Sequence, residues 1–128
     1  MKFTVDRSKW YRGKGESQSA LLRSDDQRCC IGFVGQQCGV PDIHMLNYSS
    51  ILDIEVLNSI RLFPAWMQEK EPVNIEELRR IYPDMPEHQS RIRLAYCVND
   101  DLSLSDEQRE EKLKQIFAAA GDEIEFIN

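Results

Sequence analysis

The chain has 128 residues, 41% of them hydrophobic and 30% charged, with a formal net charge of −6 at pH 7. This length suits one domain, and the composition is that of a globular protein and not of a disordered one. The sequence contains no apolar run near the roughly 20 residues of a membrane span, and its first ten residues lack the apolar core of a signal peptide. We therefore expect a single domain over residues 1–128, cytoplasmic and without a membrane partner.

The N-terminal part of the chain is expected to form strands and turns. Residues 2–6 alternate and place Phe3 and Val5 on one face, which predicts a short half-buried strand. A glycine-containing loop follows at 12–17. Residues 19–23 predict a second short strand, which a polar turn at 24–26 ends.

Residues 29–38 predict a buried helix. Its apolar residues fall at helical spacing, namely Cys30, Phe33, Val34 and Cys38. We expect Asp25 or Asp26 to cap the start, and Gly39 to end it. Interior Gly32 and Gly35 indicate close approach of another element, which we expect to be the sheet. Cys29 and Cys30 point to different faces, so at most one of the two should be buried.

The middle of the chain is irregular in pattern. Short helices are expected at 41–46 and at 74–81, the second capped by Asn74 with Glu77 and ended before Pro83. The apolar cluster at 62–67 is either a core-filling loop or an exposed contact patch. In the second case the patch would favour a homodimer, and the sequence leaves both a monomer and a homodimer open.

The C-terminal third is the most regular part of the sequence. A helix is expected over 88–98, ended by Asn99-Asp100-Asp101. Another is expected over 106–120, with Ser105 and Gln108 as a capping box and an apolar stripe formed by Leu113, Ile116, Phe117 and Ala120. Residues 123–127 alternate, which predicts a strand.

These elements predict an α+β fold. The N- and C-terminal strands each have one apolar face, so we expect them to share a small sheet, with the helices near 29–38 and 106–120 covering that face.

Charge is distributed unevenly along the chain. Residues 1–28 contain seven Lys/Arg and four Asp/Glu, whereas residues 98–128 contain three and nine. Two interpretations of the basic segment stay open. Trp10 among Arg12, Lys14 and other cations resembles a stacking surface for single-stranded nucleic acid, or the segment simply faces the acidic C-terminal part.

Three further motifs have a possible chemical role beside a structural one. The loop Arg12-Gly13-Lys14-Gly15 offers amides and cations to a phosphate, although it is not a Walker A sequence. Residues 99–110 match a calcium loop poorly, because Leu104 stands where glycine is needed. The cysteines lack zinc spacing, and Cys29 at a helix start would need His44 or His88 as a base. We expect no metal, no cofactor and no catalytic residue.

Three stretches resemble small uncharacterised proteins of bacteriophages and prophages. They are FTVDRSKWYRG at 3–13, RCCIGF at 28–33, and the ending from Asn99 through Ser105 to Phe126. The resemblance implies an accessory protein that works inside an infected bacterium, and it carries no activity or site residue with it. Small phage proteins of this kind often block host or defence machinery by occupying a surface.

The expected function is therefore non-catalytic binding to a host protein, as an anti-defence inhibitor. The expected contact residues are Trp10, Arg12, Lys14, Phe63 and Trp66. Two alternatives stay open, a nucleic-acid-binding module that uses the basic, aromatic N-terminal segment and a small nucleotide-binding protein or enzyme that uses the 12–15 loop.

Overall fold

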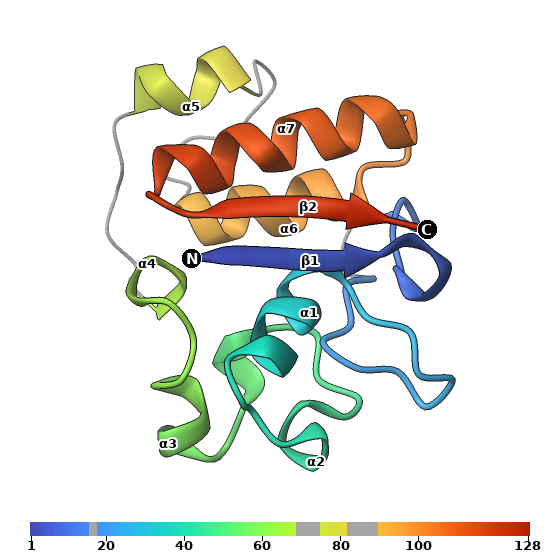
Figure 1. The fold of residues 1–128 in the computed structure, drawn as a ribbon, viewed down its shortest axis with the longest axis vertical. Helices are drawn as coiled ribbons and strands as arrows, with labels where there is room; N and C mark the ends of the chain where they lie inside the picture. The colour runs from blue at the N-terminus through green and yellow to red at the C-terminus, as the bar shows by residue number, and fades with distance from the viewer. Residues whose placement is uncertain (16–17, 69–74, 82–89) are drawn as a thin grey trace.

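The computed structural model describes residues 1–15, 18–68, 75–81 and 90–128. It confirms the expected α+β layout (Figure 1). Strands β1 (Lys2–Asp6) and β2 (Glu123–Ile127), from the two ends of the chain, pair in parallel, with Phe3 beside Ile124. Because side chains alternate along a strand, Phe3 and Val5 of β1 point inward together with Ile124 and Phe126 of β2.

Seven α-helices and two short 3₁₀-helices are found in the described residues. They are η1 (Arg7–Lys9), α1 (Cys30–Gln37), α2 (Asp42–Met45), η2 (Ile51–Asp53), α3 (Leu57–Ile60), α4 (Ala65–Gln68), α5 (Ile75–Ile81), α6 (Arg91–Asp100) and α7 (Asp106–Ala119). As expected, α1 packs on β1 and α7 packs on β2. Helix α6 contacts α1, α4 and α7, and it lies behind the sheet in Figure 1, so it is the central helix of the core.

The apolar cluster at 62–67 lies in the core. Phe63 and Met67 are buried, and Trp66 packs edge-on against Phe117 with ring centroids 5.1 Å apart. The Trp66 indole donates a hydrogen bond to Asp122, 2.9 Å away. Phe63, Trp66 and Met67 thus follow the core-filling interpretation, whereas Leu62, at 45% exposed, lies on the surface.

The start of α1 differs from the prediction. Cys29 is the N-cap residue and forms no side-chain cap bond, while Asp25 and Asp26 bond elsewhere in their own turn and to Lys9. The first free N–H of the helix, that of Cys30, instead donates to Oδ1 of Asn99 on α6, at 3.0 Å. This cap comes from a distant part of the chain, so no local pattern could reveal it. Both cysteines are buried, which corrects the expectation that only one would be.

The close approach that Gly32 and Gly35 predicted is present, but its partner is not the sheet. A Cβ on Gly32 would lie 1.9 Å from the backbone oxygen of Leu21, and one on Gly35 would meet the side chains of Met45 and Phe63. Residues 19–23 are therefore not the expected strand. They cross α1 closely and form a single parallel bridge between Leu22 and Leu46.

The C-terminal helices follow the sequence more closely. The capping box of Ser105 and Gln108 is present at the start of α7. Helix α6 starts at Arg91, capped by Ser90, and continues through Asn99 and Asp100, where the sequence predicted its end. The expected capping pair of Asn74 and Glu77 lies outside the described part, because Asn74 and the side chain of Glu77 are not described. The same holds for Pro83 and for His88, where the 88–98 helix was expected to start.

Candidate functional site

The loop at 12–15 is attached to the end of α6. The N–H groups of Gly13 and Gly15 donate to the carbonyls of Asn99 and Asp100, both at 2.8 Å. Gly13 has a positive φ of 64°, and a Cβ there would lie 2.8 Å from the Arg109 guanidinium. Because the amides that would bind a phosphate already bond to carbonyls, this loop closes the C-terminus of a helix.

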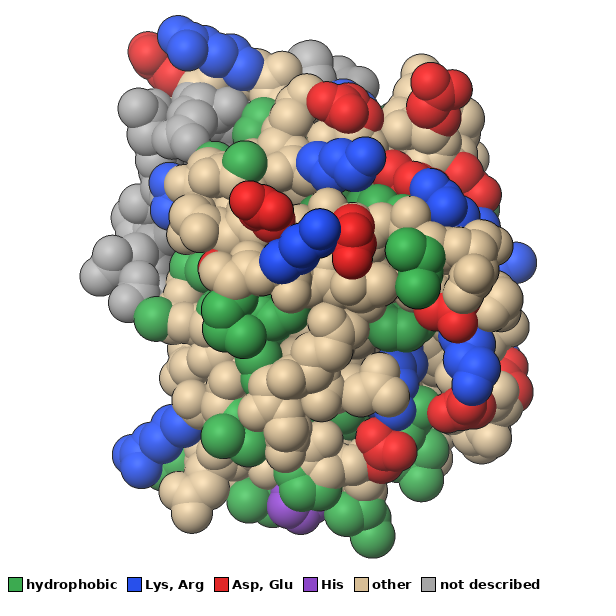
Figure 2. Space-filling model, viewed as in Figure 1, with side chains coloured by type: hydrophobic (Ala, Val, Ile, Leu, Met, Phe, Trp, Pro, Cys, Tyr) green, Lys and Arg blue, Asp and Glu red, His purple; other side chains and the backbone are tan. Residues whose placement is uncertain are grey.

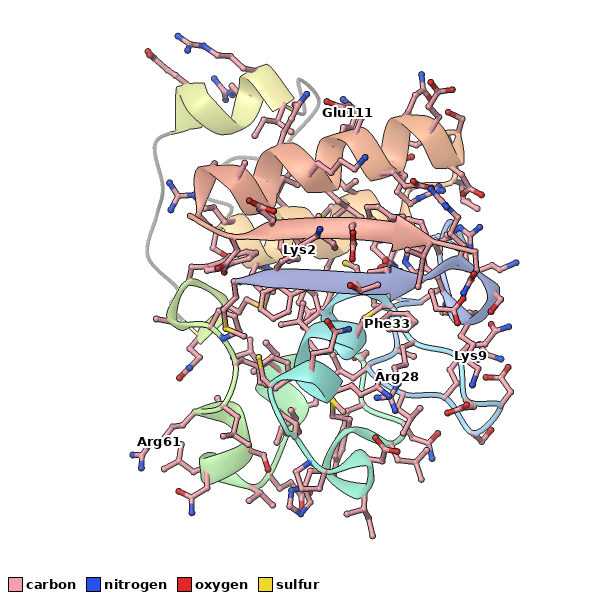
Figure 3. The ribbon with its side chains drawn as sticks, in the orientation of Figure 1. Lys2, Lys9, Arg28, Phe33, Arg61 and Glu111 are labelled. Carbon is pink, nitrogen blue, oxygen red and sulfur yellow. The ribbon has the colours of Figure 1, made fainter. Side chains whose placement is uncertain are left out.

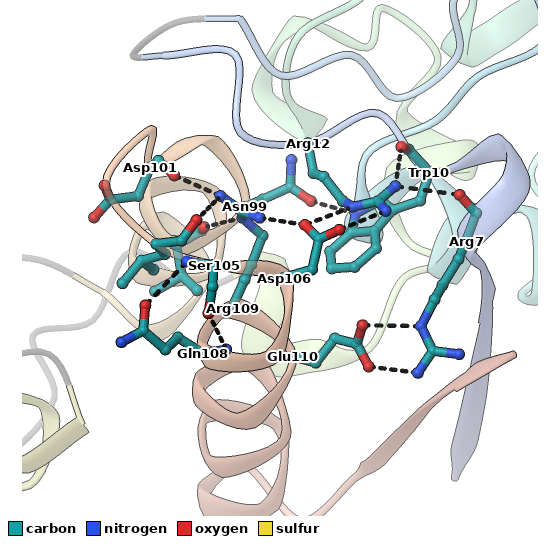
Figure 4. A network of polar contacts seen from close by, with 12 residues as sticks. Arg7, Trp10, Arg12, Asn99, Asp101, Ser105, Asp106, Gln108, Arg109 and Glu110 are labelled. Carbon is teal, nitrogen blue, oxygen red and sulfur yellow. Dashed lines mark hydrogen bonds and ion pairs between the residues drawn. The ribbon is translucent and has the colours of Figure 1, made fainter.

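Arg109, on α7, completes this closure. Its guanidinium donates to the backbone carbonyls of Val98 (3.2 Å) and Leu104 (3.0 Å), to that of Asp101, and to the Asp106 carboxylate (2.8 Å). Figure 4 shows these bonds converging on one side chain. Arg109 thus fixes the turn between α6 and α7.

Asn99 lies at the centre of the same network. Its side-chain oxygen accepts from the indole N–H of Trp10 (2.8 Å) as well as from Cys30, and its NH₂ donates to the Tyr11 carbonyl (3.0 Å) and to Asp100 (3.1 Å). An amide side chain can accept two hydrogen bonds at its oxygen and donate two through its nitrogen, so all four positions are used. The Asn99 side chain therefore has a structural role, because none of its hydrogen-bonding positions is left over.

The cations of the N-terminal segment pair with acidic side chains. Arg12 lies over the Trp10 ring, 4.6 Å from its centroid, and binds both carboxylate oxygens of Asp106 at 3.0 and 2.8 Å. Six of the seven Lys/Arg of residues 1–28 form such pairs, and Lys14 is the exception among the described residues. The pairs are Lys2–Glu125, Arg7–Glu110, Lys9–Asp26, Arg12–Asp106, Arg23–Asp25 and Arg28–Asp42.

This pairing bears on the two interpretations of the basic segment. Lys2, Arg7 and Arg12 face carboxylates of the acidic C-terminal part, which confirms that interpretation. Nucleic-acid affinity comes chiefly from cations that neutralise phosphates, and carboxylates already neutralise these. Trp10 is only 3% exposed, so its ring is not available to stack on a base.

Two shallow hollows lie on the surface of the described part. One, of about 310 Å³, is lined by Ser19, Ala20, Arg23, Ser24, Asn47, Tyr48 and Ser49, and holds no histidine, cysteine or carboxylate to serve as a base. The other, of about 300 Å³, is lined by Trp10, Tyr11, Arg12, Lys14, Gln27 and Asp106. Its carboxylate is held by Arg12 and Arg109, which lower the pKa of Asp106. In the first hollow the Ser19 hydroxyl is bonded to the carboxyl of Asp100 at 2.7 Å, and neither hollow is lined by a cysteine or a histidine.

The cysteines at the start of α1 are unsuited to catalysis. Burial raises the pKa of Cys29 to about 12 and also raises that of Cys30, so neither thiol is activated as a thiolate nucleophile. His44 is engaged elsewhere, with its Nδ1 2.7 Å from the Ser59 hydroxyl. Within the described ranges, no three His, Cys, Asp or Glu residues are grouped as metal ligands.

The buried carboxyl of Asp100 supports a prediction about pH. Burial raises its pKa, although Ser19 and Asn99 donate hydrogen bonds to it. The unfolded chain releases this proton near the ordinary pKa of 3.8, and the folded protein releases it only at higher pH. The free energy of unfolding therefore falls as the pH rises from 3.8 to the pKa of Asp100 in the folded protein. Asp100→Asn keeps an oxygen for Ser19 and removes the charge. The variant should therefore gain stability over the wild type as pH rises.

Urea unfolding of both proteins at about pH 4 and about pH 8 measures this difference. We expect a difference in the free energy of unfolding close to zero at the lower pH and in favour of Asp100→Asn at the higher pH. A difference that does not change with pH would contradict the assignment of a buried charge to Asp100.

One part of the surface is apolar. Nine large hydrophobic side chains are exposed in the part of the chain that the structure describes, and six of them lie between residues 43 and 62: Ile43, Leu46, Leu52, Val56, Leu57 and Leu62. We call these six the α2–α3 surface. Figure 2 shows hydrophobic side chains gathered at the lower end of the molecule, where α2 and α3 lie in Figure 1. The contact between His44 on α2 and Ser59 on α3 holds the two helices together.

The structure separates the residues that the sequence proposed as contacts. Trp10 and Arg12 meet in the N-terminal segment, with Lys14 lining the same hollow. Phe63 and Trp66 lie elsewhere, and Phe63, at 2% exposed, cannot contact a partner in this structure. The α2–α3 surface was missed because its six aliphatic residues have no period that separates exposed from buried positions.

No protein-family model, no curated protein and no solved structure gives a significant match to this chain. The helices of the described residues are too short or too polar for any of them to cross a membrane.

Proposed function

We propose that this protein acts by binding another protein through the α2–α3 surface, without catalysis. The observation that carries the proposal is the concentration of exposed apolar side chains over α2, η2 and α3. Contiguous exposed apolar surface usually marks a contact site, because leaving it in water is unfavourable. Ile43, at 77% exposed, and Leu57 extend into solvent from the two helices that His44 and Ser59 connect.

The resemblance to phage and prophage proteins supports a more specific proposal. On that basis the partner is a protein of the infected bacterium, and occupation of its surface inhibits it, as an anti-defence protein does. The paired cations of the N-terminal segment and the occupied amides of the 12–15 loop favour this proposal over the nucleic-acid and nucleotide alternatives.

Affinity capture from bacterial lysate, followed by binding measurements with the purified partner, tests the proposal. We expect a protein that stays bound after nuclease treatment and at high salt. The variant Ile43→Ser/Leu57→Ser should weaken binding at least about tenfold, since each truncation of an apolar contact costs on the order of 1 kcal/mol. Leu102→Ser is the matched control, because Leu102 is 72% exposed but lies between α6 and α7.

Two results would count against the proposal. Loss of all captured material on nuclease treatment would indicate nucleic-acid binding. Equal affinity of the double variant and the control variant would show that the α2–α3 surface is not the contact site.

A further inference from the structure

The hollow of about 310 Å³ lies between two segments that are hydrogen-bonded to each other. Residues of the segments 19–24 and 47–49 line it. The N–H groups of Leu21 and Asn47 each donate to a carbonyl of the other segment, at 2.8 Å. These bonds hold the two walls together, so the hollow does not need a ligand to form it. Its volume is at the lower end of the range for small-molecule sites.

Arg23 is the one charged residue in the lining of this hollow, and it is held on two sides. Its Nε donates to both carboxylate oxygens of Asp25 at 3.2 Å, and its guanidinium carbon lies 4.1 Å from the centroid of the Tyr11 ring. A guanidinium has five N–H donors in one plane, and Asp25 uses only the donor at Nε. Stacking on a ring leaves the edge of that plane open. Within the described residues, the two terminal nitrogens of Arg23 therefore keep their donors for another acceptor.

Neutral polar groups surround this guanidinium. The side chains of Ser24, Asn47 and Tyr48 line the same hollow and form no hydrogen bond within the described residues. Hydroxyl and amide groups both donate and accept, so they match the hydroxyl groups of a ligand. The lining contains no carboxylate to repel an anion and no large aliphatic side chain.

We propose that this hollow binds a small phosphate ester that carries hydroxyl groups. The phosphoryl group binds the terminal nitrogens of Arg23, because a guanidinium donates two parallel hydrogen bonds to phosphate oxygens. The hydroxyl groups of the ligand bond to Asn47 and Tyr48. None of the residues that line the hollow belongs to the α2–α3 surface, so the site is independent of the protein contact proposed above.

Titration of the intact protein with inorganic phosphate tests the anion site. Amide chemical shifts measured by NMR at constant ionic strength report where phosphate binds. We expect the amides of Ser24, Asn47 and Ser49 to shift and to saturate, with a dissociation constant of about 10 mM or lower. The absence of a saturable shift at these amides up to about 50 mM phosphate would overturn the proposal.

Two variants of the cation and its carboxylate should change phosphate affinity in opposite directions. Arg23→Gln removes the charge and should weaken binding at least about fivefold. Asp25→Asn removes the negative charge next to Arg23 but keeps an oxygen for the Gln27 N–H, so it should strengthen binding about twofold or more. If Asp25→Asn weakens binding, Arg23 is not the group that holds the anion.

Arg61→Gln is the matched control, because it removes the same charge at an exposed residue. Figure 3 shows Arg61 on the opposite side of the molecule from Lys9, which bonds to Asp26 in the turn that follows Arg23. The control variant should bind phosphate as the wild type does. Equal weakening by Arg23→Gln and Arg61→Gln would show that phosphate responds only to overall charge, and the proposal would fail.

Glycerol 3-phosphate is the probe for the hydroxyl groups of the ligand. It should bind at least about threefold more tightly than inorganic phosphate, since its hydroxyls add hydrogen bonds. Asn47→Gly removes the amide but tolerates the positive φ of 65° at this position, and it should reduce this advantage while leaving the affinity for inorganic phosphate unchanged. Equal affinity of the wild type for the two compounds would contradict a hydroxylated ligand.

Discussion

Replacing Asn99 with leucine is expected to lower the free energy of unfolding by about 4 kcal/mol or more, a large part of the stability of a domain of this size. Asn99 is fully buried, and its side chain makes four hydrogen bonds. Leucine has a similar volume but makes none. The indole N–H of Trp10, the N–H of Cys30 and the carbonyl of Tyr11 would each lose a partner inside the protein, at about 1–3 kcal/mol apiece.

Urea denaturation followed by tryptophan fluorescence measures this loss. The same substitution at Asn58, an exposed residue of α3, is the control and should change stability by less than about 0.5 kcal/mol. Asn99→Asp keeps the acceptor but cannot donate when ionised, and it places a second carboxylate beside Asp100. Its destabilisation should therefore be smaller at low pH. If Asn99→Leu stays within about 1 kcal/mol of the wild type, the network does not hold the fold together.

Replacing Gly32 with alanine is expected to destabilise the protein by about 3 kcal/mol or more. A Cβ at this position would lie 1.9 Å from the oxygen and 2.7 Å from the carbonyl carbon of Leu21. These are backbone atoms, and they cannot move freely. The Leu21 N–H is bonded to the Tyr48 carbonyl at 2.8 Å, and the carbonyl of Ala20 accepts from Cys29 at 2.7 Å. The clash therefore outweighs the roughly 1 kcal/mol that alanine gains over glycine in a helix.

Two other glycines provide a graded comparison in the same unfolding experiment. At Gly35 a Cβ would meet the Met45 sulfur and the Phe63 ring, both at 2.7 Å, and these side chains can adjust in part. Gly121 has a φ of 87° and open space around it, so alanine there should cost only about 1 kcal/mol of backbone strain. We expect Gly32→Ala to be the most destabilising of the three. An equal effect at Gly32 and Gly121 would show that the contact with Leu21 relaxes at little cost.

The sequence by itself determined the strands and the helix start that depend only on neighbouring residues. The alternation at 2–6 and 123–127 gave both strands, and two apolar faces predicted that they share a sheet. The capping box, a pattern of only four residues from Ser105 to Gln108, fixed where α7 starts. Such patterns suffice because alternation, helical spacing and caps depend on neighbouring residues.

The tertiary structure decided every feature whose partner is distant in the chain. Asn99 caps α1 from 69 positions away from Cys30, which is why Asp25 and Asp26 were wrong candidates. The amides of Gly13 and Gly15 bond to the end of α6, so these two amides are not available to a phosphate. A local pattern shows which backbone N–H and C=O groups need hydrogen-bond partners. It does not show which distant group in the chain will bond to them.

Exposure was decided in the same way. Phe63 and Ile43 have similar apolar character in sequence, yet Phe63 is buried and Ile43 extends into solvent. The difference arises because Phe63 packs against α1 at Gly35, whereas α2 places Met45 against the same glycine and leaves Ile43 in solvent. Hydrophobicity indicates a tendency to be buried, and only the arrangement of the whole chain determines which residues are covered.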